Sequence, residues 1–146
     1  AVTGSTELML SGIAYPNGLA FTPDGKTLYL CESAKNQILK FKVDSKGKLS
    51  NKTVFVKLPG GAPDGIALDV KLNLYAAHFA GGNIYVISPG GKILENIPTP
   101  GKKPSNLEFA GKDMKTLYIT EDETNKVYSI RTKIEGMRLF GTPVKK

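Results

Sequence analysis

The feature that most constrains this chain is a pattern that recurs three times at fixed spacing. Each copy opens with a proline, at Pro16, Pro63 and Pro104, and runs on to a Leu-Tyr pair. The pairs lie at 28–29, 74–75 and 117–118, and a β-branched residue follows each tyrosine after nine positions. Spacing that is kept through three copies, with periods of 47 and 41 residues, is typical of a protein built from one repeated structural unit.

Each copy divides into short runs of β-branched and aromatic residues, separated by Gly, Pro, Asn or Asp, and this predicts four strands per copy. The first copy contains GLAFT (18–22), TLYLCE (27–32), QILKFKV (37–43) and TVFVKL (53–58). The second contains GIALD (65–69), NLYAAH (73–78), NIYVIS (83–88) and ILENIP (93–98). The third contains NLEFA (106–110), TLYITE (116–121), KVYSIR (126–131) and MRLF (137–140). No segment has a helical period.

Four antiparallel strands in every repeat of about 40 residues indicate an all-β protein made of β-propeller blades. The repeats cover about 16–58, 63–98 and 104–140, so we expect one partial propeller domain of about three blades over residues 1–146. A closed propeller needs at least four blades. We therefore expect another part of the protein, or a second copy of the chain, to complete a six-bladed ring.

Composition narrows the classes of partner. The net charge is +7, but the lysines are scattered and many lie in turns, and the chain has only two arginines. Nucleic-acid-binding proteins usually have clustered Lys and Arg with stacking aromatics, so we expect no nucleic-acid partner. No apolar run approaches the length of a membrane span, and no signal peptide is expected at the start. The compartment stays open: we expect a soluble protein, cytoplasmic, or periplasmic or secreted after processing.

Two candidate ligands for a cation follow the first two prolines. Asn17 and Asp64 occupy matching positions just before the first strand of their repeats. In a propeller this strand lines the central channel, so an amide and a carboxylate oxygen should converge there, which suits Ca²⁺, Mg²⁺, Mn²⁺ or Zn²⁺. The alternative is that Asn-Gly and Asp-Gly serve only as turn pairs. The third repeat has Ser105 and Asn106 here, and we expect Asn106 to line the channel mouth and contact substrate.

A second matching position lies three residues after each tyrosine, where the repeats have Glu32, His78 and Glu121. His78 is the only histidine, and three roles stay open for it: packing or hydrogen bonding, substrate contact or proton transfer, and metal binding. We expect the two glutamates to cap loops or to meet solvent. The tyrosines of the Leu-Tyr pairs are expected to pack between blades.

Four stretches resemble the senescence-marker-protein/gluconolactonase family: PNGLAFTPDGKTLYLCES, PDGIALD, LYAAHFAGGNIYVISPGGKIL and PSNLEFAGKDMKTLYIT. Members of this family are six-bladed propellers that include regucalcin and bacterial sugar lactonases, and this chain resembles the C-terminal half. The resemblance implies a divalent cation held by an N-terminal Glu, the Asn of PNG and the Asp of PDG. The last two correspond to Asn17 and Asp64, whereas the Glu and the family's substrate-binding Arg/Asn pair have no counterpart here.

The resemblance implies a lactonase that depends on one divalent cation, with Ca²⁺ as the first expectation and Zn²⁺, Mg²⁺ or Mn²⁺ as alternatives. Asn17 would be a ligand only, and Asp64 would bind the metal and take a proton from the attacking water. His78 and Asn106 are the expected substrate contacts. We expect activity only when the ring is completed by a second half or by dimerisation. The alternative is a non-catalytic half-propeller that binds a protein or calcium.

Overall fold

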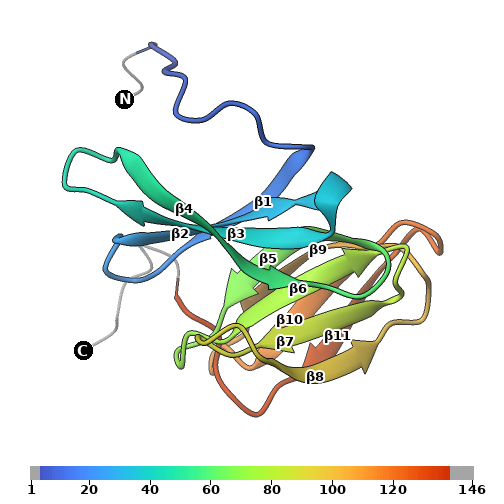
Figure 1. Cartoon of the computed structure of the whole chain (residues 1–146). Helices are drawn as coiled ribbons and strands as arrows, with labels where there is room; N and C mark the ends of the chain where they lie inside the picture. Colours follow the sequence, from blue (N-terminus) through green and yellow to red (C-terminus); the bar gives the residue numbers. More distant parts are fainter. Residues whose placement is uncertain (1–3, 139–146) are drawn as a thin grey trace.

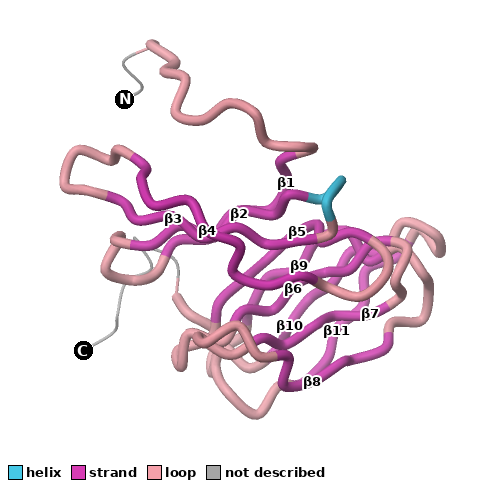
Figure 2. Tube along the Cα trace, viewed as in Figure 1, coloured by secondary structure: helices cyan, strands magenta, loops and turns pink. Residues whose placement is uncertain are grey.

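The computed structural model of the chain describes residues 4–138, which form three antiparallel β-sheets and one short 3-10 helix. Each repeat forms its own sheet (Figure 1), which confirms the all-β propeller class. Strands and short connecting loops make up nearly the whole trace (Figure 2). Within residues 4–138, no helix is long and apolar enough to cross a membrane.

In each sheet the strands pair in the order in which they follow along the chain. The first sheet contains β1 (Pro16–Phe21), β2 (Thr27–Glu32), β3 (Gln37–Val43) and β4 (Leu49–Lys57), with the 3-10 helix η1 (Ser33–Lys35) after β2. The second sheet contains β5 (Ala62–Leu68), β6 (Leu74–Phe79), β7 (Asn83–Ile87) and β8 (Ile93–Pro98). The third contains β9 (Pro104–Ala110), β10 (Thr116–Glu121) and β11 (Lys126–Arg131). These strands match the runs read from the sequence to within a few residues.

The fourth strand expected in the third sheet, over 137–140, differs from the prediction. Met137 and Arg138 lie outside any strand, and Leu139 and Phe140 lie outside the described residues. The Met137 N–H instead donates to the Leu68 carbonyl of the second sheet at 2.8 Å, and its side chain packs on the apolar cluster between the first two sheets. In the described part of the chain, the third sheet therefore has three strands.

The sheets pack face to face through two apolar layers. Tyr29, from the first sheet, packs with Phe55 in a layer shared with the second sheet, with ring centroids 4.7 Å apart. Tyr75, from the second sheet, packs edge-on against Phe109 of the third at 5.0 Å. The third tyrosine of the series, Tyr118, is 47% exposed because it points away from the second sheet. The packing role is thus confirmed for two of the three tyrosines, where a neighbouring sheet is present.

The two outermost sheet faces differ in their cover. On the first sheet, the outward face holds a buried cluster that includes Leu39 and Phe41, and Leu10 and Ile13 of the preceding segment pack against it. On the third sheet, the outward face carries Tyr118 and Val127, and Val127 is 65% exposed. Exposed apolar side chains on a sheet face indicate a surface that a further layer can cover.

The inner edge strands lie side by side, β1 next to β5 and β5 next to β9, and they border one side of a space that we call the hub. Glycine allows this approach. A Cβ placed on Gly18 would lie 2.1 Å from the Asp64 carbonyl oxygen of β5. One placed on Gly65 would lie 2.7 Å from the Asn106 Cα of β9. The glycines that follow Asn17 and Asp64 therefore let the inner strands come into backbone contact.

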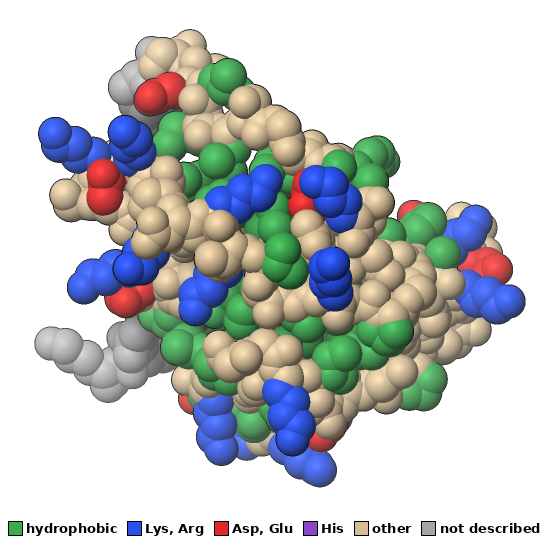
Figure 3. Space-filling model, viewed as in Figure 1, with side chains coloured by type: hydrophobic (Ala, Val, Ile, Leu, Met, Phe, Trp, Pro, Cys, Tyr) green, Lys and Arg blue, Asp and Glu red, His purple; other side chains and the backbone are tan. Residues whose placement is uncertain are grey.

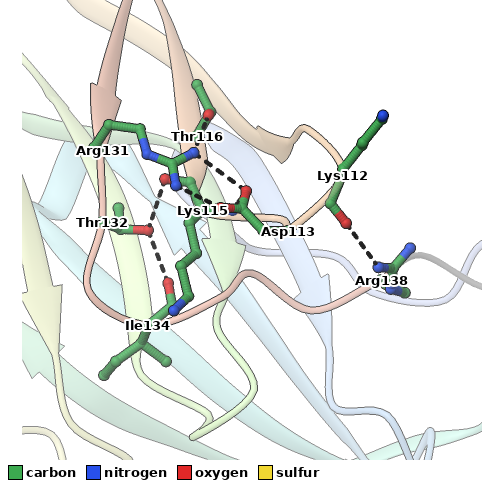
Figure 4. A network of polar contacts seen from close by, with 8 residues as sticks. All are labelled: Lys112, Asp113, Lys115, Thr116, Arg131, Thr132, Ile134 and Arg138. Carbon is green, nitrogen blue, oxygen red and sulfur yellow. Dashed lines mark hydrogen bonds and ion pairs between the residues drawn. The ribbon is translucent and has the colours of Figure 1, made fainter.

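A surface network fastens the turn between β9 and β10 to β11 (Figure 4). The Arg131 guanidinium donates to both carboxylate oxygens of Asp113 and, at 2.7 Å, to the Thr116 hydroxyl. The Arg131 hydrogen bonds lower the pKa of the Asp113 carboxyl to about 2. Arg138 donates to the Lys112 carbonyl at 3.3 Å, so the segment after β11 is tied to the same turn. Because the Arg131–Asp113 ion pair is exposed, its contribution to the stability of the fold is small.

Candidate functional site

The same irregularity occurs at the start of each inner strand. In the first sheet, pairing passes from Pro16 opposite Glu32 to Leu19 opposite Leu30, which leaves one extra residue on β1. The other two sheets show the same shift, in the pairs Pro63–His78 and Ile66–Ala76, and Pro104–Glu121 and Asn106–Thr120. An extra residue of this kind forms a β-bulge, which bends the strand and re-aims its side chains. The first two bulges contain Asn17 and Asp64.

Two cavities at the hub share both of these residues. The first cavity, of about 460 Å³, is lined by Tyr15, Asn17, Ser33, Ala34, Ala62, Pro63, Asp64, Phe79 and Asp122. The second cavity, of about 590 Å³, is lined by Asn17, Gly18, Leu19, Asp64, Gly65, Ile66, Ser105, Asn106, Leu107 and Glu108. The structure therefore brings together Asn17, Asp64 and Asn106, three of the four residues expected at the site.

The Asp64 carboxyl has a raised pKa. Burial is the main cause, because it disfavours the charged form, and the negative charge of Asp122 acts in the same direction. The Asn17 side chain lowers the pKa of Asp64 and partly offsets the rise. Asp64 is thus a carboxylate held near a second carboxylate in a partly buried place, where a cation would be stabilising.

The donor chemistry of Asn17 and Asp64 fits part of a cation site. A neutral amide oxygen and a carboxylate oxygen are the ligands that hard cations prefer, and Ca²⁺ takes six to eight of them. Among residues 4–138, no group of three or more His, Cys, Asp and Glu side chains is arranged to hold a metal ion. These two residues can therefore supply part of a coordination shell.

Glu32 and Glu121, the glutamates three residues after their tyrosines, are buried rather than solvated. The Glu32 carboxylate accepts the Ala14 N–H at 2.9 Å, from the segment that leads into β1. The Glu121 carboxylate accepts the Lys103 N–H at 2.7 Å, from the segment that leads into β9. The expectation that they cap loops is confirmed and the solvent alternative is wrong, because backbone N–H groups take the place of water.

His78 occupies the equivalent place in the second sheet and is also fully buried. Asn36 donates its amide N–H to the Gly60 carbonyl at 2.6 Å, so its oxygen is left to accept from His78 Nε2 at 3.1 Å. Burial lowers the pKa of His78 and favours the neutral ring. His78 Nδ1 faces Asn83 Oδ1 at 3.4 Å, and Asn83 Nδ2 is buried with no hydrogen-bond partner among residues 4–138. Exchanging the Asn83 amide oxygen and nitrogen would give His78 Nδ1 a donor.

Through Asn36, His78 thus holds the segment before β5 in place. His78 does not line either hub cavity in the described chain. Substrate contact by His78 stays a prediction. Asp122 belongs to the acidic run Glu121-Asp122-Glu123, which the sequence left open between attracting a cation and forming a solvated loop, and it lines the first cavity with Asp64. Its signal was weak, because an acidic run in a loop after a strand also fits an ordinary solvated turn.

The sequence is similar to proteins of a known family. A family model described as SMP-30/Gluconolactonase/LRE-like region matches residues 1–122. The chain belongs to this family. Within the SMP-30/gluconolactonase family, 6-deoxy-6-sulfogluconolactonase of Pseudomonas putida is 32% identical over 123 residues, which are 82% of this chain and 42% of that protein. Gluconolactonase of Zymomonas mobilis is 35% identical over 144 residues, which are 91% of this chain and 39% of that protein.

Among solved structures, luciferin-regenerating enzyme superposes with a TM-score of 0.78 and 27% identity. The match covers 87% of this chain and 48% of that one. The chain thus spans less than half the length of these relatives. This share agrees with the expectation that the chain corresponds to one half of a six-bladed member of the SMP-30/gluconolactonase family.

Proposed function

We propose that this chain forms the C-terminal half of a lactonase that depends on a divalent cation, with Ca²⁺ as the first candidate. Its substrate would be a sugar lactone or a similar cyclic ester. The observation that carries the proposal is that Asn17 and Asp64 occupy equivalent bulges and line the same two hub cavities. The names of the Pseudomonas and Zymomonas relatives, both lactonases, support the same reaction class.

In this mechanism Asn17 and Asp64 supply oxygen ligands to the cation. The cation, when bound, would polarise the lactone carbonyl and stabilise the negative charge that develops on its oxygen. Asp64 takes a proton from the attacking water, because its carboxylate lines both hub cavities beside the place proposed for the cation. The water oxygen first bonds to the carbonyl carbon, and the ring C–O bond then breaks as the C=O double bond re-forms. The ring oxygen takes back the proton held by Asp64 and leaves as the hydroxyl of the open acid. Asn106, at the wall of the second cavity, can hydrogen-bond a substrate hydroxyl.

Activity is tested by following acid release from glucono-1,5-lactone with and without added Ca²⁺, Zn²⁺, Mg²⁺ or Mn²⁺. We expect turnover that a chelator abolishes and that falls by at least about 100-fold in Asp64→Asn, the size typical of a lost general base. Glu95→Gln, an exposed carboxylate on β8, is the matched control and should keep full activity. Equal rates in the wild type and Asp64→Asn, above the spontaneous hydrolysis rate, would refute the role of Asp64.

Completion of the ring is part of the proposal. The outward face of the third sheet exposes Tyr118 and Val127, which a neighbouring blade could cover. Either the absent N-terminal half or a second copy of this chain would supply that blade. In a two-fold dimer, two copies of Asn17 and Asp64 would face one axis and offer up to four oxygen ligands. Sedimentation of the chain tests dimerisation, and equilibrium dialysis tests cation binding; a dimer that holds no divalent ion would remove this version.

A second candidate is a non-catalytic half-propeller that binds calcium or a protein. It is favoured by the incomplete donor set, because no group of three or more His, Cys, Asp and Glu side chains among residues 4–138 is arranged to hold a metal ion. Tight self-association or calcium binding without turnover of any lactone, in the completed ring, would support this candidate over the lactonase.

A further inference from the structure

The hub has the opposite charge to the rest of the molecule. The chain carries 20 Lys and Arg and a net charge of +7, and Lys and Arg side chains are spread over the face seen in Figure 3. The linings of the two hub cavities contain no Lys or Arg, and their charged residues are Asp64, Glu108 and Asp122. Within the described chain, the positive charge of the protein is therefore kept out of the hub.

Asp122 is the carboxylate whose position in the first cavity is best defined. The Ser105 hydroxyl donates to its Oδ1 at 2.7 Å, and its backbone N–H donates to the Lys103 carbonyl at 3.0 Å. The preceding residue, Glu121, is buried, and its carboxylate accepts the Lys103 N–H. The start of the loop after β10 is therefore bonded to both the N–H and the carbonyl of Lys103. These contacts orient the carboxylate and leave Oδ2 without a hydrogen bond from the described residues.

A carboxylate in this place has two effects on a ligand. Its oxygens accept hydrogen bonds from hydroxyl groups, which a sugar lactone carries in abundance. It also repels a negatively charged group, and the absence of Lys and Arg from both cavity linings leaves that repulsion uncompensated in the described chain. The Pseudomonas relative is named for a sulfo-substituted lactone, so substrate charge is a property by which members of this family differ.

We propose that Asp122 is a specificity-determining residue that makes the hub select electrically neutral, polyhydroxylated ligands over analogues that carry a phosphate or sulfonate group. The naming of a lactone as the ligand rests on the proposed function, whereas the selection by charge rests on the cavity lining alone. Asp122→Asn keeps the size of the side chain and an oxygen for the Ser105 hydroxyl, and removes the charge.

The first readout does not need catalysis. The backbone and side-chain amide signals of the isotope-labelled 146-residue chain are followed during titration with glucitol and with glucitol 6-phosphate. We expect the signals of Asn17 and Ser105 to shift with glucitol and to shift at roughly tenfold higher concentration with the phosphate, because like charges brought together at a binding site weaken binding. In Asp122→Asn the difference between the two ligands should shrink, and in Glu95→Gln it should remain. The wild-type difference should also shrink at high salt, since the hub is open to solvent.

The second readout compares kcat/KM for glucono-1,5-lactone and 6-phosphogluconolactone in the assembled protein, for the same variants. A preference for the neutral lactone that Asp122→Asn reduces, with the melting temperature unchanged, supports the proposal. Equal or tighter binding of the phosphate by the wild type, no shift of hub signals with either ligand, or a ratio that Asp122→Asn leaves unchanged overturns it. Selection of glucitol with no turnover of either lactone would refute the lactonase and leave the charge selection standing.

Discussion

The substitution Gly18→Ala tests whether the inner strands meet in backbone contact at the hub. The added Cβ would lie 2.1 Å from the Asp64 carbonyl oxygen, 2.9 Å from the Gly65 Cα and 3.0 Å from the Ile66 nitrogen. Non-bonded carbon atoms normally approach to about 3.5–4.0 Å, so β1 and β5 must separate. Overpacking a tight site costs about 1–3 kcal/mol, and the upper end is expected because all three neighbours are backbone atoms that no rotamer change can move.

Thermal and urea unfolding of the chain measure this cost. A loss of about 3 kcal/mol lowers the melting temperature by roughly 6–12 °C in a protein of this size. Gly90→Ala is the matched control, since the nearest atom to its new Cβ is the Ser88 hydroxyl oxygen at 3.8 Å. The control should be unchanged or stabilised by up to about 1 kcal/mol, through the lower entropy of its unfolded chain. If Gly18→Ala melts within a degree or two of Gly90→Ala, the close approach of β1 and β5 is refuted.

Two further predictions concern buried groups. The pKa of Glu32 is lowered to about 2, first by the Ala14 N–H and then by Lys35, so its ionised form stabilises the fold above about pH 4.5 and that contribution is lost as the pH falls toward 2. Glu32→Gln should therefore be less stable than the wild type at pH 7, and the gap should close by pH 2–3 in urea unfolding; a gap independent of pH would contradict the assignment. Cys31 is fully buried and burial raises the pKa of its thiol, so it should not react with an aromatic disulfide reagent until denaturant is added. Rapid labelling of the native chain would show that the layer between the first two sheets is open.

The repeat pattern was sufficient to predict the sheets, because each strand is a short run of β-branched and aromatic residues closed by a turn. Both ends of β2, β3, β8, β10 and β11 were predicted to the residue. The end of the third repeat was not, because Met137 packs on the layer between the first two sheets and its N–H donates to the Leu68 carbonyl. The position of Met137 depends on an apolar surface that forms only when the sheets pack together, so the sequence of one repeat cannot predict it.

The pairing of Asn17 with Asp64 could be predicted because equal positions in a repeat come to equal places in a ring. The burial of Glu32 could not be predicted, because two N–H groups take the place of water around its carboxylate. One is the backbone N–H of Ala14, 18 positions away, and the other is the side-chain amide of Gln37. Asp122 could not be assigned to the site for a related reason: its approach to Asp64 crosses between two repeats, and the sequence of neither repeat alone predicts it.

The bulges at Asn17 and Asp64 have a consequence for how such a site can change. A strand without the inserted position would alternate strictly, and every later side chain would turn to the opposite face. Deleting one residue at the Asp64 bulge would therefore exchange the side chains that β5 presents to the first sheet, such as Ile66, with those that it presents to the third, such as Ala67. Substitution at these positions, by contrast, leaves the alternation of side chains along the strand unchanged. Point replacements are thus the tolerated route by which duplicated units acquire different chemistry, as the change from Asn17 to Asp64 to Ser105 along one polypeptide illustrates.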